Sequence, residues 1–185
     1  LIQKGLVFAP QPLGKKDVLI LDDKIGAITE PGKVKVQGVD FHLVDASEKI
    51  IIPGFIDSHV HILGGGGEGG PATRAPEIKI EEIISSGVTT VIGCLGTDGT
   101  TRHMESLLAK ARGLEIEGIT TFIFSGSYQI PVVTITGSIL SDLILIDKVI
   151  GAGEVAISDH RSSQPLFEEI ARLAAECRLG GMLGG

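Results

Sequence analysis

From residue 55 onward, short apolar runs alternate with longer stretches in which apolar residues recur every three or four positions. The apolar runs predict strands over residues 55–62, 88–97, 119–126 and 154–160. The periodic stretches predict helices over residues 77–87, 103–118, 138–153 and 166–181, with Gly87, Gly118 and Gly180 at helix ends. Because both sides of each strand are apolar, the pattern is typical of parallel strands covered by helices. Four strand–helix units therefore predict an α/β fold built from right-handed crossovers.

Residues 1–50 follow a different pattern, in which β-branched runs are separated by Pro, Gly and Asp-Asp turns. We expect a small β-sheet domain over residues 1–50, followed by the α/β domain over residues 51–185. Four units can form an open doubly wound sheet or one half of a (β/α)8 barrel, since a whole barrel needs eight units and usually about 250 residues.

Composition narrows the possible functions. The 185 residues are 43% hydrophobic, which is enough for one sizeable core and a small appendage. The net charge of −7 and the absence of Trp argue against a nucleic-acid or anionic-membrane surface. No apolar run is long enough for a signal peptide or a membrane span. Cys94 and Cys177 form no CxxC pair, which predicts reduced thiols of a cytoplasmic protein, with a single disulfide as the alternative.

Two histidines end the first strand of the α/β region. His59 and His61 lie two residues apart, so both side chains face the same side of a strand. Neutral imidazoles that converge from one side suit zinc, and the ends of such strands carry the chemistry of barrel enzymes. Asp57 lies on the same face and is a candidate to support these ligands or to pair with a neighbouring loop. The spacing alone leaves open a simpler interpretation, that the two histidines are polar residues facing a loop.

The segment GGGGEGG follows the histidines almost at once. Exposed N–H groups could cradle an anion, but the segment lacks the GK[ST] ending of a P-loop and the spacing of a dinucleotide site. The glycines favour a loop whose backbone approaches a ligand closely. Glu68 is the one side chain that such a loop offers, and it could bind a cationic group such as a free amine or remain a solvated carboxylate.

A family resemblance rests on the segments FIDSHVHILGGGGEGGPATRAPE, CLGTDGTTRHMESLLAK, SGSYQIP, TITGSI and AISDHRS. Together they resemble the isoaspartyl (β-aspartyl) dipeptidases of the amidohydrolase superfamily, over essentially the whole chain but only the N-terminal half of a family member. The resemblance implies a (β/α)8 barrel with a small β-sandwich built from both chain ends, and a homo-oligomer. It also implies two zinc ions per subunit and a small-molecule substrate, a β-aspartyl dipeptide. The isopeptide bond after the β-linked aspartate would be cleaved by a metal-activated hydroxide.

The resemblance also assigns substrate contacts. It places Gly66 and Glu68 against the substrate, with Glu68 on the α-amino group, and Thr97 at another contact position. Arg161 would bind a carboxylate, which suits the bidentate guanidinium. Tyr128 would polarise the scissile carbonyl. From the residues alone, Tyr128 could instead cap a barrel end, and Arg161 could pair with a nearby acid, Asp159 or Glu168.

The metal ligands follow the same resemblance with one departure. His59 and His61 would bind the more buried metal. Many relatives bridge the two metals with a carbon-dioxide-modified lysine at the start of the fourth strand, where this chain has Glu154. Glutamate presents the same two oxygens on a shorter stem, so we expect Glu154 to be the bridging ligand, with a buried acid paired to a neighbour as the alternative. Lys148 lies inside the preceding helical pattern and is a poor candidate.

Part of the family's site has no counterpart in this sequence. Relatives take two more histidines and a general-base aspartate from strands five, six and eight, and neither His103 nor His160 matches those positions. The chain is therefore expected to be a truncated half that is inactive alone. Two other functions stay open, namely a related hydrolase of cyclic amides, such as a dihydroorotase or hydantoinase, and a non-catalytic metal-binding fragment.

Overall fold

The computed structural model describes residues 1–184, and the chain divides into two compact units after Gly54. The sequence pattern places the corresponding boundary after residue 50. Each unit has its own sheet.

The first unit contains a five-stranded sheet. Its strands are β1 (Ile2–Phe8), β2 (Pro12–Leu21), β3 (Lys24–Thr29), β4 (Val44–Asp45) and β5 (Ile50–Ile51). The order is β3-β2-β1-β4, and β5 also pairs with β1. The first three strands are antiparallel, whereas β4 and β5 run parallel to β1.

One fully buried carboxylate joins two backbone segments of this unit. Asp17 on β2 accepts hydrogen bonds from the backbone N–H groups of Lys4 (2.9 Å) and Gly32 (2.7 Å). Lys4 has a φ of 63°, which is unfavourable for a residue with a side chain. The bond from its N–H to Asp17 offsets part of that cost.

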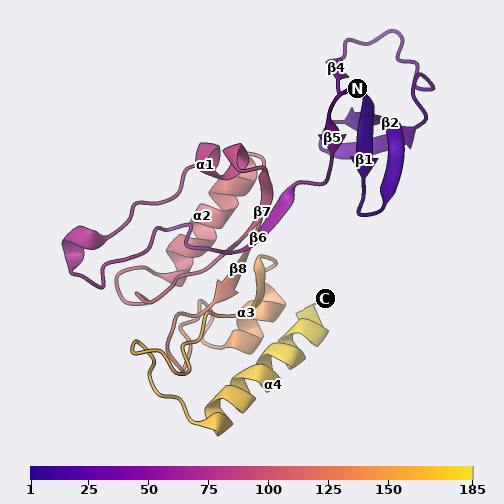
Figure 1. The fold of residues 1–185 in the computed structure, drawn as a ribbon. Coiled ribbons are helices and arrows are strands. Elements are labelled where there is room, and N and C mark those ends of the chain that lie inside the picture. The colour runs from indigo at the N-terminus through magenta and orange to yellow at the C-terminus, as the bar shows by residue number, and fades with distance from the viewer. Residues whose placement is uncertain (185) are drawn as a thin grey trace. The chain divides into compact units, whose positions relative to one another are not determined.

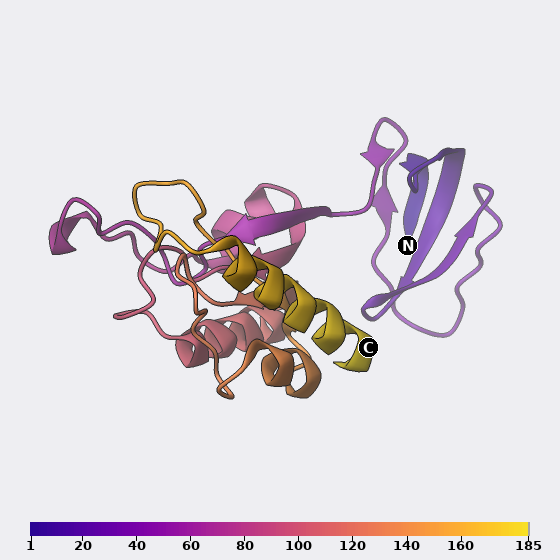
Figure 2. The ribbon, with the colours of Figure 1, turned by 90° about the horizontal axis from the view of Figure 1, so that it is seen from below.

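The second unit contains a parallel sheet in the order β6-β7-β8-β9. Its strands are β6 (Phe55–Val60), β7 (Val88–Gly93), β8 (Thr120–Ser125) and β9 (Val149–Ala152). A short 3-10 turn, η1 (Pro71–Thr73), lies in the first connection, and the helices are α1 (Ile80–Ser85), α2 (Met104–Ile116), α3 (Ile139–Leu145) and α4 (Phe167–Gly184). Sheet order follows chain order, so right-handed crossovers bring every connecting helix to one face (Figure 1). Figure 2 shows α2, α3 and α4 gathered on one side of β6. This is the predicted first half of a (β/α)8 barrel.

The fourth strand–helix unit differs from the sequence prediction. The third helix ends at Leu145 rather than continuing to residue 153, and the segment Val149–Ala152, which begins with two β-branched residues, forms the strand. Residues 154–160, predicted as a strand, form a loop. The prediction was wrong because the turn contains no Gly or Pro, and its polar pair Asp147-Lys148 also fits the exposed face of a continuing helix. The backbone bond of this turn joins the Val149 N–H to the Ile146 carbonyl (3.0 Å).

The last helix is longer than predicted. It runs through Gly180, which was expected to end it. Gly180 is buried against α3, where an added Cβ would lie 2.7 Å from the Leu143 side chain. The glycine therefore permits close packing of two helices and does not cap one. Among residues 1–184, no helix combines the length and the apolar character that a bilayer crossing requires.

The core of the second unit lies between the sheet and the helices. On α2, Leu107, Ala111 and Leu114 are buried at helical spacing and belong to the same apolar cluster as Val91 of β7 and Ile123 of β8. This cluster holds the strand ends in place for the loops that follow them.

Leu107 and Ile116 provide a matched test of this core. Both lie on α2, but Leu107 is fully buried whereas Ile116 is 88% exposed. Leu107→Ala should lower the free energy of unfolding by about 2–5 kcal/mol because it removes packed methyl groups and leaves a cavity. Ile116→Ala should change it by less than about 0.5 kcal/mol. Urea titration followed by circular dichroism measures both, and equal effects would contradict the assigned packing.

Candidate active site

Two histidines and a glutamate meet at the carboxyl ends of the strands. His59 is in β6, His61 follows the end of that strand, and Glu154 lies two residues beyond β9. His59 Nε2 lies 2.7 Å from Glu154 Oε2, and His61 Nε2 lies 3.5 Å from Glu154 Oε1. One ligand atom from each residue lies within 4.8 Å of the others. Strands from the two edges of the sheet thus place their polar side chains in one cluster.

The cluster has the chemistry of a divalent-cation site. Two imidazoles and a carboxylate are common zinc ligands. Glu154 Oε1 and His61 Nδ1 are buried with no hydrogen-bond partner among the described residues. An unpaired buried carboxylate oxygen is costly, and a bound cation would remove that cost. The residues present therefore fit a metal.

Gly96 lies directly against the second histidine. It has a φ of +79°, and an added Cβ would lie 2.6 Å from His61 Cε1. Any side chain at position 96 would meet the imidazole ring. The missing side chain lets the ring lie against the backbone after β7, with Nε2 facing Glu154.

The glycine loop is a tight hairpin. Gly64 and Gly66 both have positive φ, and added Cβ atoms would lie 2.1 Å from the Ala75 carbonyl oxygen and 2.6 Å from that of Thr73. The Ala75 N–H donates to the Gly65 carbonyl at 2.9 Å. These glycines are therefore required by the close approach of two segments of this chain.

Two of the predicted substrate residues, Thr97 and Arg161, bind the carboxylate of a third, Glu68. Glu68 Oε1 accepts hydrogen bonds from Thr97 Oγ1 (2.9 Å) and Arg161 Nη1 (2.8 Å). The Arg161 guanidinium lies 4.8 Å from the centre of the Tyr128 ring, and its Nε donates to Asp159 at 2.7 Å. Arg161 therefore makes both the pairing with Asp159 that the sequence suggested as an alternative and a contact with the glycine loop. Glu68 is held by hydrogen bonds and is not a freely solvated acid.

These contacts set the charge states. The hydrogen bonds from Arg161 and Thr97 lower the pKa of Glu68. The carboxylates of Asp159 and Glu68 raise the pKa of Arg161. Burial, followed by the nearby charge of Glu154, raises the pKa of Tyr128. At neutral pH the phenol is therefore a hydrogen-bond donor between an anion and a cation.

A cavity of about 210 Å³ opens between these groups and His61. Its lining includes most of the predicted site residues, namely His61, Gly66, Glu68, Thr97, Tyr128 and Arg161. A second hollow of about 160 Å³ is lined by Tyr128 and Arg161 together with Glu154 and Asp159. The same two side chains thus line both hollows.

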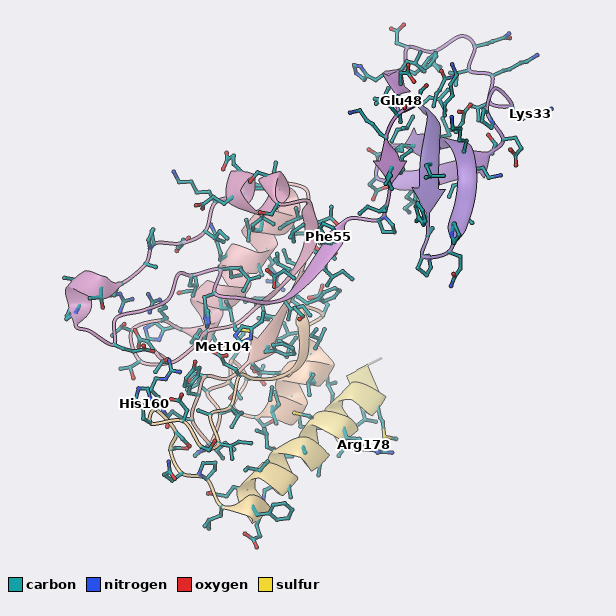
Figure 3. The ribbon with its side chains drawn as sticks, viewed as in Figure 1. Lys33, Glu48, Phe55, Met104, His160 and Arg178 are labelled. Carbon is teal, nitrogen blue, oxygen red and sulfur yellow. The ribbon has the colours of Figure 1, made fainter. Side chains whose placement is uncertain are left out.

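Three other basic residues considered as metal ligands from the sequence lie away from the two histidines and Glu154. His160 is on the loop between β9 and α4 (Figure 3), and its side chain is 84% exposed. His103 precedes α2 as its N-cap residue. Lys148 precedes β9, at the end of the strand opposite Glu154, and pairs with Glu115 on α2. None of the three belongs to the group formed by the two histidines and Glu154.

Sequence reasoning missed a set of buried polar groups that hold the site loops. Asp142 on α3 is fully buried and accepts hydrogen bonds from Ser125 Oγ, Thr136 Oγ1 and two backbone N–H groups, of Ile135 and Thr136. These bonds hold both ends of the loop that carries Tyr128. The Thr136-x-Ser138 start of α3 gave a signal for a capped helix, but no signal for a carboxylate that faces inward.

A second anchoring carboxylate follows β7. Asp98 accepts hydrogen bonds from the N–H groups of Thr100 and Thr101 and from Arg74 Nη1 (2.9 Å), and it lies 3.5 Å from Arg102 Nη1. The Asp-Gly-Thr-Thr sequence predicts a turn of this kind. Its link to the glycine loop through two arginines could not be read from the sequence.

Known proteins resemble this chain in sequence and in fold. A family model described as "Amidohydrolase family" matches residues 50–182. The chain belongs to the amidohydrolase family. Two structures of the β-aspartyl dipeptidase from Fervidobacterium islandicum AW-1 superpose on the whole chain. One, a complex with the β-Asp-Leu dipeptide, is 56% identical with a TM-score of 0.90; the other is 55% identical with a TM-score of 0.91.

The chain spans about half of these relatives, since it covers 48% and 50% of the two dipeptidase chains. An adenine deaminase from Halalkalibacterium halodurans is 28% identical over 75% of this chain and 23% of its own length. A D-hydantoinase from a Bacillus sp. AR9 is 21% identical, covers 96% of this chain and 38% of its own, and has a TM-score of 0.64. The hydantoinase likeness shows the barrel fold alone.

Asp98 should make stability depend on pH. Burial disfavours its charged form, but the hydrogen bonds from Thr101 and Thr100 and from Arg74 outweigh burial and hold the pKa below its ordinary value of 3.8. The stabilisation is therefore present above about pH 3.8 and is lost as the pH falls through the lower folded-state value. Asp98→Asn should lower the free energy of unfolding at neutral pH and weaken its decline toward about pH 3.

Urea titrations at several pH values measure this effect. Asp147→Asn is the control, because Asp147 is exposed and its nearest cation, on Arg112, is 3.9 Å away. A decline with acid that is the same in wild type and Asp98→Asn would contradict the assigned role.

Proposed function

We propose that the full-length protein hydrolyses β-aspartyl dipeptides at the isopeptide bond. The proposal rests on one observation above all. The carboxylate of Glu68 and the guanidinium of Arg161 form an ion pair, and both side chains line the same cavity as the candidate metal ligand His61. The 56% identical dipeptidase structure, which contains β-Asp-Leu, supports the same substrate class.

The substrate's own charges match this pair. A β-linked aspartate carries a free α-ammonium and a free α-carboxylate on the same carbon, so the two charges are adjacent. Glu68 would bind the ammonium and Arg161 the carboxylate, each exchanging its present partner for the substrate. The bidentate guanidinium suits a carboxylate, and Asp159 keeps it oriented. Gly66 and Thr97 line the cavity beside them.

The metal ligands are proposed to be His59, His61 and Glu154, with Glu154 as the bridge between two zinc ions. A glutamate has two oxygens, and here each lies nearest a different histidine. When bound, zinc supplies a nucleophile from water at neutral pH. The histidines and Glu154 hold that centre at the carboxyl ends of β6 and β9.

Tyr128 is proposed to stabilise the oxygen of the scissile carbonyl. Its phenol stays protonated because burial and Glu154 raise its pKa. It lines both the cavity that contains Glu68 and Thr97 and the hollow that contains Glu154. A donor aimed at a developing oxyanion contributes roughly 3 kcal/mol to catalysis.

Removing the charge of Glu154 tests the bridging role. Glu154→Gln keeps the shape of the side chain but replaces one oxygen with a poor ligand. Metal content per full-length chain, measured by atomic emission after dialysis, should fall from about two to one or fewer. His160→Gln, a change on an exposed loop, is the control and should keep full occupancy. Unchanged occupancy in Glu154→Gln would refute the bridge.

Substrate choice tests the function itself. The full-length protein should hydrolyse β-Asp-Leu and should leave N-acetyl-β-Asp-Leu largely intact, because Glu68 would have no ammonium to bind. Dihydroorotate is the discriminating competitor, because a cyclic-amide hydrolase would open it faster than it cleaves the dipeptide. A preference for dihydroorotate would overturn the proposal, whereas metal binding without turnover of either would favour a non-catalytic role.

Tyr128→Phe separates chemistry from binding in the same assay. Loss of the hydroxyl should lower kcat by about 10²–10³-fold, as for other oxyanion donors, while metal content remains that of the wild type. An unchanged kcat would remove Tyr128 from the reaction.

A further inference from the structure

We propose that Arg102 is the positioning residue of the glycine loop, and that through this loop it sets where Glu68 lies relative to the metal ligands. The consequence for substrate affinity rests on the proposed function. The positioning itself rests on contacts that are independent of any substrate.

Arg102 is a buried charge with an unusual set of partners. Its side chain is 5% exposed, and it emerges from the loop just before α2. Nε donates to the Leu63 carbonyl at 3.3 Å, and Nη2 donates to the Gly65 carbonyl at 2.8 Å. A guanidinium can hold two carbonyls at once because its donors form a rigid fork.

These two carbonyls lie in the segment that connects a candidate metal ligand to a candidate substrate ligand. Leu63 and Gly65 lie between His61, a candidate metal ligand, and Glu68, the candidate ammonium ligand. The intervening glycines have no side chains with which to pack, so their own sequence does not fix the backbone path. Arg102 fixes it from outside, from a segment that follows a different strand.

Asp98 completes the arrangement. Its carboxylate lies 3.5 Å from Arg102 Nη1 and accepts a hydrogen bond from Arg74 Nη1, on the returning arm of the loop. Arg74 also forms an antiparallel bridge with Gly66. The outgoing arm is thus held by Arg102 and the returning arm by Arg74, with one carboxylate between them.

The contacts of Arg102 reach the loop and not the metal ligands' side chains. Its hydrogen bonds and ion pair go to Leu63, Gly65 and Asp98. Weakening it should therefore move Glu68 while leaving the histidines and Glu154 in place. Substrate affinity and metal occupancy should respond differently, which a general loss of structure would not produce.

Arg102→Lys tests the inference in the full-length protein. Lysine keeps the positive charge but is a single point donor, so it cannot hold both carbonyls. We expect KM for β-Asp-Leu to rise about tenfold or more, with kcat changed by less than about threefold and metal content unchanged. Arg112→Lys is the matched control, since Arg112 is an exposed arginine on α2 whose ion pair to Asp147 is 3.9 Å long.

A double-mutant cycle identifies the residue through which Arg102 acts. If it acts through Glu68, Arg102→Lys should have little further effect on KM in the Glu68→Gln background. Effects of the two changes that simply add would overturn the proposal, as would loss of metal in Arg102→Lys.

Hydrogen exchange provides a readout that needs no catalysis. Amides of residues 63–70 should exchange about tenfold faster in Arg102→Lys, whereas those of β7 and α2 should not change. Unchanged exchange in the loop would overturn the proposal even if the enzyme is active. If no β-aspartyl dipeptide is hydrolysed at all, the proposed function fails and the exchange result still decides the role of Arg102. Arg102→Gln, which keeps an amide donor, is the second variant should the lysine variant not fold.

Discussion

The curvature of the parallel sheet is the constraint on which the rest of the second unit depends. In the order β6-β7-β8-β9, the first and last strands are three positions apart, which in a flat sheet means a separation of roughly 14 Å. Yet His59 from β6 lies 2.7 Å from Glu154, just beyond β9. The carboxyl ends of the strands therefore converge, as they do in a barrel. A cluster of two imidazoles and a carboxylate exists only because the sheet bends.

Because the strand ends converge, the loops that follow them must also be held in defined positions. Buried charged side chains hold these loops. Loops at the carboxyl ends of strands carry the polar groups of the site, and nothing in the strands fixes their paths. Asp142 holds the loop that carries Tyr128, and Asp98 with Arg102 holds the loop that carries Glu68. These carboxylates and the guanidinium satisfy backbone groups that would otherwise be costly to bury. The rigidity of the site thus comes from polar side chains at the rim and from the apolar core beneath it.

Much of this organisation could be predicted from the sequence. The strand–helix alternation gave the fold class, and the motif segments gave the family, because both are local patterns. The fourth strand was misplaced because the turn between Ile146 and Val149 contains no Gly or Pro, and a charged pair there also fits the exposed face of a helix. The roles of Asp98, Arg102 and Asp142 could not be predicted, because each contacts residues that are distant in sequence or that face inward for reasons set by packing. The pairing of Glu68 with Arg161, 93 positions apart, is likewise a product of the fold.

Gly96 has a consequence for how this protein can change over generations. The position carries no functional group, lies outside the strands and helices, and resembles an ordinary turn glycine. Its lack of a side chain nevertheless leaves the space that the His61 ring occupies. A single-nucleotide change that adds one methyl group there would tilt a candidate ligand while the core beneath it stayed packed. Some inactivating mutations should therefore give a protein that still folds and accumulates, whereas others give an unstable protein.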